Sequence, residues 1–304
     1  MTCVDSNRRP NDHCSTKPMS FDKITSEIRG FKIALLNINS LTKHIDELKV
    51  FMANKPLDVL AINESKLDLV DSDRLVNLEG YNIVRRDRNK HGGGVCFYLR
   101  NTITFSSQYQ LENNDLELIA LEIQKPNSCP FLIATWYRPP KTPLDYLKKF
   151  EMFLNEADAR YSEIYILGDL NCNILSNPLE VHTTHLLDSI VDYQLAQLIK
   201  EPTRVNAKSQ TLIDVFITNK EDNNSHSGVY TLSINDHNLI YAVRKICLPR
   251  GQPKLIQSRN FKHFNEENFL TDLKNVSWPI IKSGMEVNSA WNSWKDIFLN
   301  IVDN

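Results

Sequence analysis

The chain has 304 residues, 41% of them hydrophobic and 24% charged, and its formal net charge at pH 7 is −2. This composition is typical of a soluble globular protein, and the near-zero charge excludes nucleic-acid binding by bulk positive charge, although a local basic patch is compatible with it. Residues 1–30 lack the apolar stretch of a signal peptide, and no run is long enough to span a membrane. We therefore expect a nuclear or cytoplasmic protein that is not secreted and has no membrane partner.

The first 30 residues are polar and without periodicity, which predicts a disordered leader over 1–30. From residue 31 short apolar runs alternate with helical patterns. Strands are predicted over 33–36, 59–62, 95–99, 116–123, 131–136, 164–167, 212–217 and 239–243, and helices around 41–52, 144–154 and 186–195. Many strands with few helices predict an α/β fold, a mixed-sheet sandwich, rather than a strict βαβ repeat.

The composition changes again after residue 248, where Pro249, Gly251 and Pro253 lie close together and predict a linker. Further on, a short helix is expected near residues 264–273, and an aromatic stripe at helical spacing (Trp291, Trp294, Phe298, Ile301) runs to the last residues without a stop signal. We expect one domain over 31–247, followed over 248–304 by a linker and a partial helical segment of a chain that has been cut.

Polar side chains follow several predicted strands at the point where each strand ends. Asp169 and Asn171 end an apolar run in which Gly168 admits close backbone approach, and two residues at this spacing on a strand point to the same side. The sequence Gly-Asp-x-Asn also occurs in ordinary turns, but further polar groups recur in order, at 37–39, 63–65, 137–140, 214 and 235–237. Polar groups supplied by separate strand ends are how α/β enzymes assemble an active site.

These residue types suit hydrolysis of a phosphate ester. Glu64 is a hard oxygen ligand of the kind that holds magnesium, and Asn37 and Asn39 offer neutral amides on one side of their strand. Asp169 could take a proton from water or align that water with phosphorus, while Asn171 fixes its geometry.

Three further residues could act on the phosphate itself. Tyr137 can donate its hydroxyl to a phosphate oxygen, and His237, supported by the carboxylate of Asp214, can be a cation that stabilises developing charge. Each has a structural alternative: a solvated glutamate, a core-edge tyrosine, or a plain turn at 235–237. Asp214 is harder to explain in that way, because a carboxylate within a buried strand is costly unless it is paired.

In this order the set resembles the endonuclease/exonuclease/phosphatase superfamily over roughly residues 31–247. The resemblance implies a four-layer α/β sandwich, in which two mixed, mostly antiparallel sheets pack face to face with helices outside. It implies a magnesium site, with manganese as a substitute, and assigns metal binding to Glu64, Asn39 and Asp236, with catalytic roles for Asn37, Tyr137, Asp169, Asn171, Asp214 and His237. Abasic-site repair members usually have Asp in place of Asn39 and Ser in place of Asn235, so one acidic group near the metal is missing here.

Within this superfamily the chain looks most like the N-terminal endonuclease of LINE-type (non-LTR) retrotransposons. The similarity lies in Arg-Arg-Asp-Arg at 85–88 before the glycines at 92–94, Trp-Tyr-Arg-Pro-Pro at 136–140 and Thr-Leu-Ile-Asp at 211–214. It implies double-stranded DNA as the partner, and residues 259–273 resemble the linker toward a reverse transcriptase, which is expected downstream but absent from this chain.

The DNA-binding residues are expected in a basic loop formed by Arg85, Arg86, Arg88 and Lys90, together with Arg138 and Thr203. A solvated turn is an equally weighted interpretation of that loop. The leading hypothesis is a magnesium-dependent endonuclease that nicks DNA by activated-water attack and leaves a 3′-hydroxyl. The alternatives are a superfamily phosphatase, an abasic-site repair nuclease and a non-catalytic retrotransposon remnant.

Overall fold

The computed structural model describes residues 21–303 apart from 126–127, 247–263, 277 and 279–285. The chain divides into two compact units, and the boundary lies between Pro249 and Arg250. Within the described residues, the first unit contains two six-stranded sheets and the second contains two α-helices. Among the described residues, no helix combines the length and apolarity that crossing a bilayer requires.

The two sheets are mixed, with one parallel pair of strands in each. The first sheet has the order β13 (Asn224–Tyr230), β14 (Leu239–Arg244), β1 (Phe31–Asn37), β2 (Val59–Asn63), β4 (Val95–Arg100) and β3 (Tyr81–Arg86), and only β1 and β2 are parallel. The second has the order β5 (Thr104–Ser107), β6 (Glu117–Gln124), β7 (Phe131–Tyr137), β8 (Ile164–Asp169), β12 (Asp214–Thr218) and β9 (Ala196–Gln197), and only β7 and β8 are parallel. A small hairpin pairs β10 (Arg204–Val205) with β11 (Gln210–Thr211).

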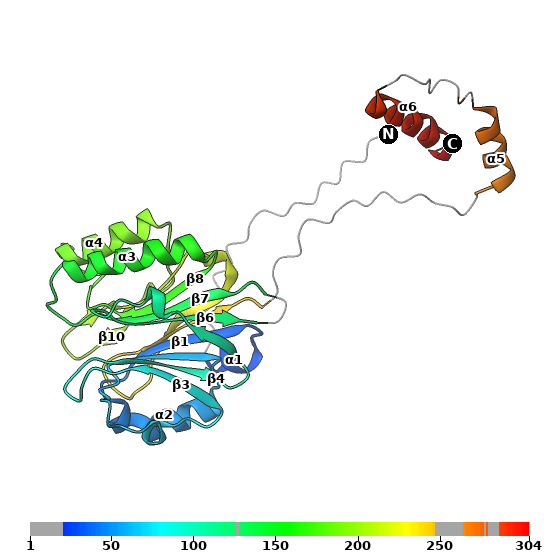
Figure 1. The fold of residues 1–304 in the computed structure, drawn as a ribbon. Coiled ribbons are helices and arrows are strands. Elements are labelled where there is room, and N and C mark those ends of the chain that lie inside the picture. Colours follow the sequence, from blue (N-terminus) through cyan, green and yellow to red (C-terminus); the bar gives the residue numbers. More distant parts are fainter. Residues whose placement is uncertain (1–20, 126–127, 247–263, 277, 279–285, 304) are drawn as a thin grey trace, which may run out of the picture. The chain divides into compact units, whose positions relative to one another are not determined.

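Helices cover the outer faces of both sheets (Figure 1). The helices α1 (Phe21–Glu27) and α2 (Leu41–Asn54) pack on the first sheet, and α3 (Asp145–Arg160) and α4 (Val181–Asp192) pack on the second. The 3-10 turns η1 (Asp73–Val76), η2 (Tyr109–Leu111) and η3 (Glu221–Asn223) lie in connections of the first unit. These layers confirm the predicted four-layer α/β sandwich with two face-to-face sheets.

The alternation of β1 explains how one strand serves two apolar layers. Phe31, Ile33 and Leu35 point into the core between the sheets, while Ala34 and Leu36 belong to the layer under α2. Successive side chains of a strand point to opposite faces, so a strand covered on both sides is apolar throughout.

Close contact between β7 and β8 requires a glycine. A Cβ atom added at Gly168 would lie 1.9 Å from the carbonyl oxygen of Trp136. No side chain fits at that distance, so Gly168 lets the end of β8 lie against β7. The following Asp169 is thereby held at the edge where both strands end.

The prediction of a disordered leader is wrong for its last part, because Phe21–Glu27 form α1. Phe21 is 4% exposed and stacks on Tyr230 at 4.6 Å between ring centroids, and Ile24 is 2% exposed. Aromatic burial against two distant strands stabilises a helix that is too short to be stable alone. Residues 1–20 of the predicted leader lie outside the described residues, as do Pro249, Gly251 and Pro253, on which the predicted linker rests.

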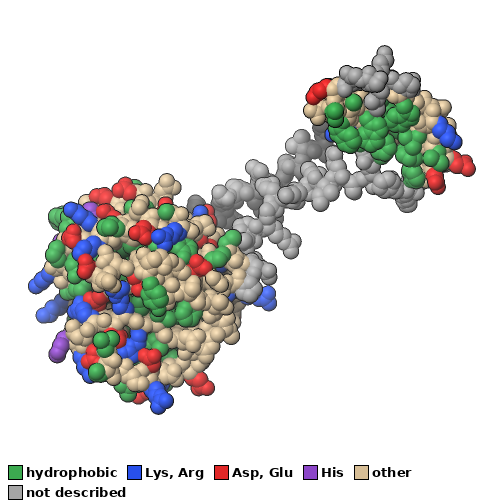
Figure 2. All heavy atoms as spheres, viewed as in Figure 1, with side chains coloured by type: hydrophobic (Ala, Val, Ile, Leu, Met, Phe, Trp, Pro, Cys, Tyr) green, Lys and Arg blue, Asp and Glu red, His purple; other side chains and the backbone are tan. Residues whose placement is uncertain are grey.

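The second unit contains α5 (Glu266–Asn275) and α6 (Val287–Asp303), which contact each other. Both predicted helices are therefore present. Trp291 stacks on Trp294 and Trp294 on Phe298, as expected for the aromatic stripe. Figure 2 shows hydrophobic side chains gathered on one face of this unit, and Trp291 is 59% exposed.

Candidate active site

The predicted site residues meet at one edge of the sandwich because of the strand directions. Asn37 ends β1 and Asn63 ends its parallel neighbour β2, while Tyr137 and Asp169 end the parallel pair β7 and β8. The antiparallel β12 begins at the same edge, with Asp214 in register with Asp169. The strand-end groups of both sheets can thus act on one ligand.

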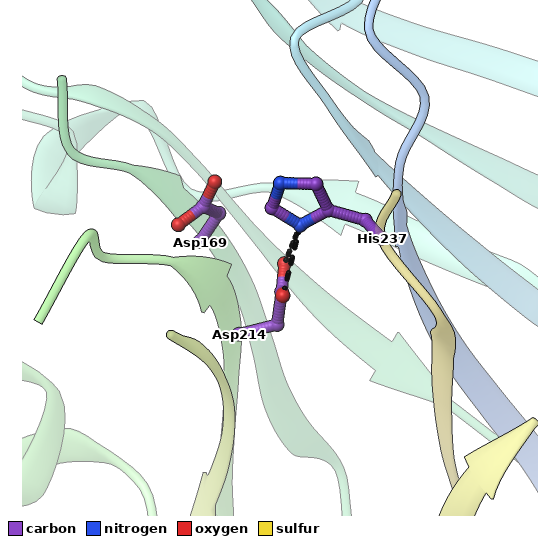
Figure 3. Close-up of side chains that lie close together, drawn as sticks. All are labelled: Asp169, Asp214 and His237. Carbon is purple, nitrogen blue, oxygen red and sulfur yellow. Dashed lines mark hydrogen bonds and ion pairs between the residues drawn. The ribbon is translucent and has the colours of Figure 1, made fainter. Parts of the chain in front are cut away.

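A buried aspartate holds the candidate catalytic histidine (Figure 3). The Nδ1 atom of His237 lies 3.0 Å from Oδ2 and 3.2 Å from Oδ1 of Asp214, and both residues are at most 5% exposed. Burial lowers the pKa of His237, but Asp214 and then Asp169 and Asp236 outweigh it, and the pKa is raised to about 9. The imidazole is therefore cationic at neutral pH, with Asp214 fixing its orientation.

Asp169 lies opposite the other edge of this imidazole. Among Asp169, Asp214 and His237, ligand atoms lie within 4.8 Å of one another. Asn37 Nδ2 donates to Asp169 Oδ2 at 2.8 Å, and the backbone N–H of Asn171 donates to Oδ1 at 3.0 Å. Burial, and then the charge of Asp214, raise the pKa of Asp169 above its ordinary value of 3.8. A carboxylate with a raised pKa is a stronger base toward a bound water.

Glu64 forms the solvent-facing side of the site. Its Oε1 accepts from Asn37 Nδ2 at 3.0 Å and from the Tyr137 hydroxyl at 3.2 Å, and its Oε2 lies 3.5 Å from Lys66 Nζ. Lys66 Nζ also donates to Asn39 Oδ1. Burial, and then the carboxylates of Glu64 and Asp169, raise the pKa of Tyr137, so its hydroxyl remains a donor.

The oxygen atoms of Glu64 and Asn39 are suitable ligands for a hard divalent cation. A carboxylate and an amide oxygen, those of Glu64 and Asn39, already share the ammonium of Lys66, so the arrangement attracts positive charge. Oxygen ligands of this kind, completed by water and a substrate phosphate, are what magnesium prefers. The buried trio of Asp169, Asp214 and His237 could also hold a metal, but the Nδ1 atom of His237 is already bound to Asp214.

Three predicted placements need correction. Asn39 and Asn171 are not strand residues, because β1 ends at Asn37 and β8 at Asp169, and both asparagines have a positive φ. Asn39 is exposed, and Asn171 Nδ2 donates to the Arg138 carbonyl at 2.8 Å. Asp214 is the first residue of its strand instead of an interior one.

Two residues assigned to DNA contact are buried. Arg138 is 2% exposed, and its Nη1 donates to the Leu170 carbonyl at 2.9 Å. Thr203 is fully buried, and its hydroxyl accepts the backbone N–H groups of Ile213 and Asp214. Both therefore support the backbone of the site, and neither presents a donor to DNA.

The predicted basic loop needs correction, because Arg85 and Arg86 are the last residues of β3 and only Arg88 and Lys90 follow the strand. Acidic side chains neutralise all four of these basic residues. Each of them is ion-paired: Arg85 with Asp73 and Asp87, Arg86 with Glu112, Arg88 with Glu117, and Lys90 with Asp68 and Asp71. This arrangement favours the structural interpretation of the loop. Arg88 and Lys90, with side chains 39% and 57% exposed, keep the best access to solvent.

Two asparagines without an assigned role connect the site. Asn63 Oδ1 accepts from the backbone N–H of Asp169 at 2.6 Å, and its Nδ2 donates to Thr135 Oγ1 at 3.0 Å, so it joins the two sheets. Asn235 Nδ2 donates to the Asn37 carbonyl, and its Oδ1 accepts the His237 N–H. The sequence did give a signal for Asn63, since it is polar and ends an apolar strand.

Comparisons with known proteins agree with this geometry. A model of the Endonuclease/Exonuclease/phosphatase family matches residues 34–235. The RNA-directed DNA polymerase from mobile element jockey of Drosophila funebris is 26% identical over 110 residues, which are 36% of this chain and 12% of that protein. The chain thus spans only a small part of that relative.

Solved structures share the fold at low identity. The endonuclease domain of TRAS1, a telomere-specific non-LTR retrotransposon, superposes with a TM-score of 0.58 at 14% identity, covering 71% of this chain and 99% of that one. The 3′ phosphatase NExo from Neisseria, bound to a product DNA hairpin, gives 0.58 at 16% identity over 71% and 99%. An AP endonuclease from Archaeoglobus fulgidus gives 0.56 at 15% identity over 71% and 100%. The chain belongs to the Endonuclease/Exonuclease/phosphatase family, because the family model matches most of its first unit and the fold agrees with that match.

Proposed function

We propose that the chain is a magnesium-dependent endonuclease that nicks double-stranded DNA by attack of an activated water and leaves a 3′-hydroxyl. The observation that supports this most directly is the buried Asp169 carboxylate facing the Asp214-supported cation of His237. A base and a cation whose ligand atoms lie within 4.8 Å of one another suit in-line displacement at phosphorus.

The side chains divide the reaction between them. Asp169 accepts a proton from the attacking water. Its carboxylate is held in place by hydrogen bonds from the Asn37 amide and the Asn171 N–H. The water oxygen forms a bond to phosphorus while the bond from phosphorus to the 3′-oxygen breaks, and the departing 3′-oxygen takes a proton from solvent and becomes the 3′-hydroxyl. His237 stabilises the negative charge that develops on the phosphate, and Tyr137 can donate its hydroxyl to a phosphate oxygen.

Glu64 and Asn39 are the residues that would hold magnesium, and manganese has the same preference for such oxygen ligands. When bound there, the ion supplies Lewis-acid polarisation of a phosphate oxygen. Asp236, the third residue assigned to the metal, is ion-paired with Arg204 at 2.7 Å. We therefore keep Glu64 and Asn39 as the proposed ligands.

The relatives favour a retrotransposon setting. The curated relative is named an RNA-directed DNA polymerase from a mobile element, and TRAS1 is a non-LTR retrotransposon. We propose that the nuclease works beside a reverse transcriptase on a longer polypeptide, in the nucleus or cytoplasm. Nicking with a free 3′-hydroxyl would provide a primer for such a polymerase.

Repair and phosphatase activities are the competing functions, because an AP endonuclease and a 3′ phosphatase share the fold equally well. Paired duplex oligonucleotides, with and without one abasic site, should both be cut in magnesium, and the nicked product should be extended by a DNA polymerase without prior phosphatase treatment. Cleavage of the abasic duplex more than ~100-fold faster, a difference of about 2.7 kcal/mol, would instead indicate repair. If the protein releases phosphate from a 3′-phosphorylated strand but cuts neither duplex, it is a phosphatase.

A further inference from the structure

Arg204 is an exposed cation attached to the catalytic elements. It begins β10, and its backbone forms a β-bridge with His237. Its Nε donates to Asp236 Oδ2 at 2.7 Å, and the Arg204 side chain is 42% exposed. The guanidinium therefore lies at the rim of the site, beside the residue that precedes the catalytic histidine.

The backbone around Arg204 is fixed to both members of the Asp214–His237 pair. The hydroxyl of Thr203 accepts the Asp214 N–H at 3.1 Å, and the Thr203 carbonyl accepts the Asn238 N–H at 2.7 Å. The N–H of Val205 donates to the Asp236 carbonyl at 2.9 Å. Arg204 is thus placed by the same hydrogen bonds that order the site, which is what a preorganised contact to substrate requires.

The carboxylates around Arg204 keep its guanidinium charged. The hydrogen bond to Asp236 raises the pKa of Arg204, and the carboxylates of Asp169 and Glu64 add smaller contributions in the same direction. Arginine has five N–H donors, and Asp236 engages the one at Nε. Within the part of the chain that the structure describes, no hydrogen bond engages the two terminal nitrogens of Arg204.

Two other cations beside the site, Arg138 and Lys66, are already bound by groups of the protein. Arg138 is buried and donates to backbone carbonyls, and Lys66 is held by Glu64 and Asn39. Arg204 alone among these three combines exposure with free terminal nitrogens, which match the paired oxygens of a phosphate.

We infer that Arg204 binds a backbone phosphate of the DNA substrate, and that Asp236 is a positioning residue that aims its guanidinium. This inference rests on the proposed function and deepens it. Asp236 then acts through Arg204 instead of through a metal ion.

The test is DNA binding by the full chain in a chelator, where cleavage does not interfere. Fluorescence anisotropy with a labelled duplex oligonucleotide would give the dissociation constant over a series of salt concentrations. The variant Arg204→Gln keeps a donor for Asp236 but removes the charge, and thermal melting would confirm that it folds. Arg160→Gln is the matched control, because Arg160 has a side chain 46% exposed, is paired with Glu156, and ends the helix before β8, at the opposite end of the sheet from Asp169.

Arg204→Gln should weaken binding about tenfold and lower the slope of log affinity against log salt by ~0.9, the contribution of one phosphate contact. Arg204→Lys should retain the slope, and Arg160→Gln should match the wild type. Asp236→Asn should weaken binding in the wild-type background but add nothing to Arg204→Gln. Unchanged slope and affinity in folded Arg204→Gln would overturn the inference while leaving the proposed nuclease intact. Absence of salt-dependent binding by the wild type would overturn both.

Discussion

Replacing Asp214 by Asn should change the titration of His237. The rise in the pKa of His237 from 6.5 to about 9 corresponds to a preference of roughly 3 kcal/mol for the charged imidazole. Asp214, 3.0 Å away, is the largest favourable cause, and burial opposes it. With a neutral amide in its place, the pKa of His237 should fall well below 9, because burial still lowers it and only Asp169 and Asp236 are left to raise it.

The sign of the activity change follows from the charged form. If nicking needs cationic His237, the wild-type rate should fall as pH rises through about 9. In Asp214→Asn the same fall should occur at a lower pH, and the rate at pH 7.5 should drop about tenfold for each unit by which the pKa of His237 lies below 7.5. The pKa can be measured by NMR titration of the imidazole, assigned with His237→Ala, alongside the pH profile of nicking. A pKa still near 9 in folded Asp214→Asn would refute the reasoning.

Three further outcomes follow from other contacts. Asn63→Ala leaves the N–H of the catalytic aspartate unpaired, so it should cost about 1–3 kcal/mol of unfolding free energy in denaturant melts and lower nicking ~100-fold; unchanged values would show that the amide is dispensable. Arg244→Met leaves the buried carboxylate of Glu163, 2.7 Å from the guanidinium, without its ion-pair partner, and should lower the free energy of unfolding by about 3–5 kcal/mol. The exposed pair of Arg160 is the control, and Arg160→Ala should change that free energy by less than ~1 kcal/mol. Equal effects of the two substitutions would contradict this account. A chain ending at residue 249 should nick DNA like the full chain, since the contacts divide there, and loss of nicking would show that the C-terminal unit contributes.

Strand positions and the edge at which the site forms could be predicted because they depend on local periodicity. The apolar run of β8 and the polar pair after it already indicated a strand end in the sequence. The exact placement of Asn39 and Asn171 could not be predicted, because each lies two residues past the end of a strand and has a positive φ, and the apolar pattern of the strand does not mark where that turn begins.

Features that depend on distant segments were missed for a common physical reason. The helix α1 is stabilised by Tyr230 and Tyr241, more than 200 residues away, and its seven residues carry too little periodicity to be recognised. The basic loop looked uncompensated because Glu112 and Glu117, which pair with Arg86 and Arg88, follow much later in the chain. Charge balance is a property of the folded chain, so sequence alone left that loop ambiguous.

The most direct measurement is conversion of a supercoiled plasmid to its nicked circle by the wild type and by Asp169→Asn, purified alike. The variant keeps the size of the side chain but removes the base. We predict magnesium-dependent nicking by the wild type, none in chelator, and a loss of ~100-fold or more in the folded variant. Equal nicking by the two proteins would contradict the assignment of Asp169 and His237 as the catalytic centre.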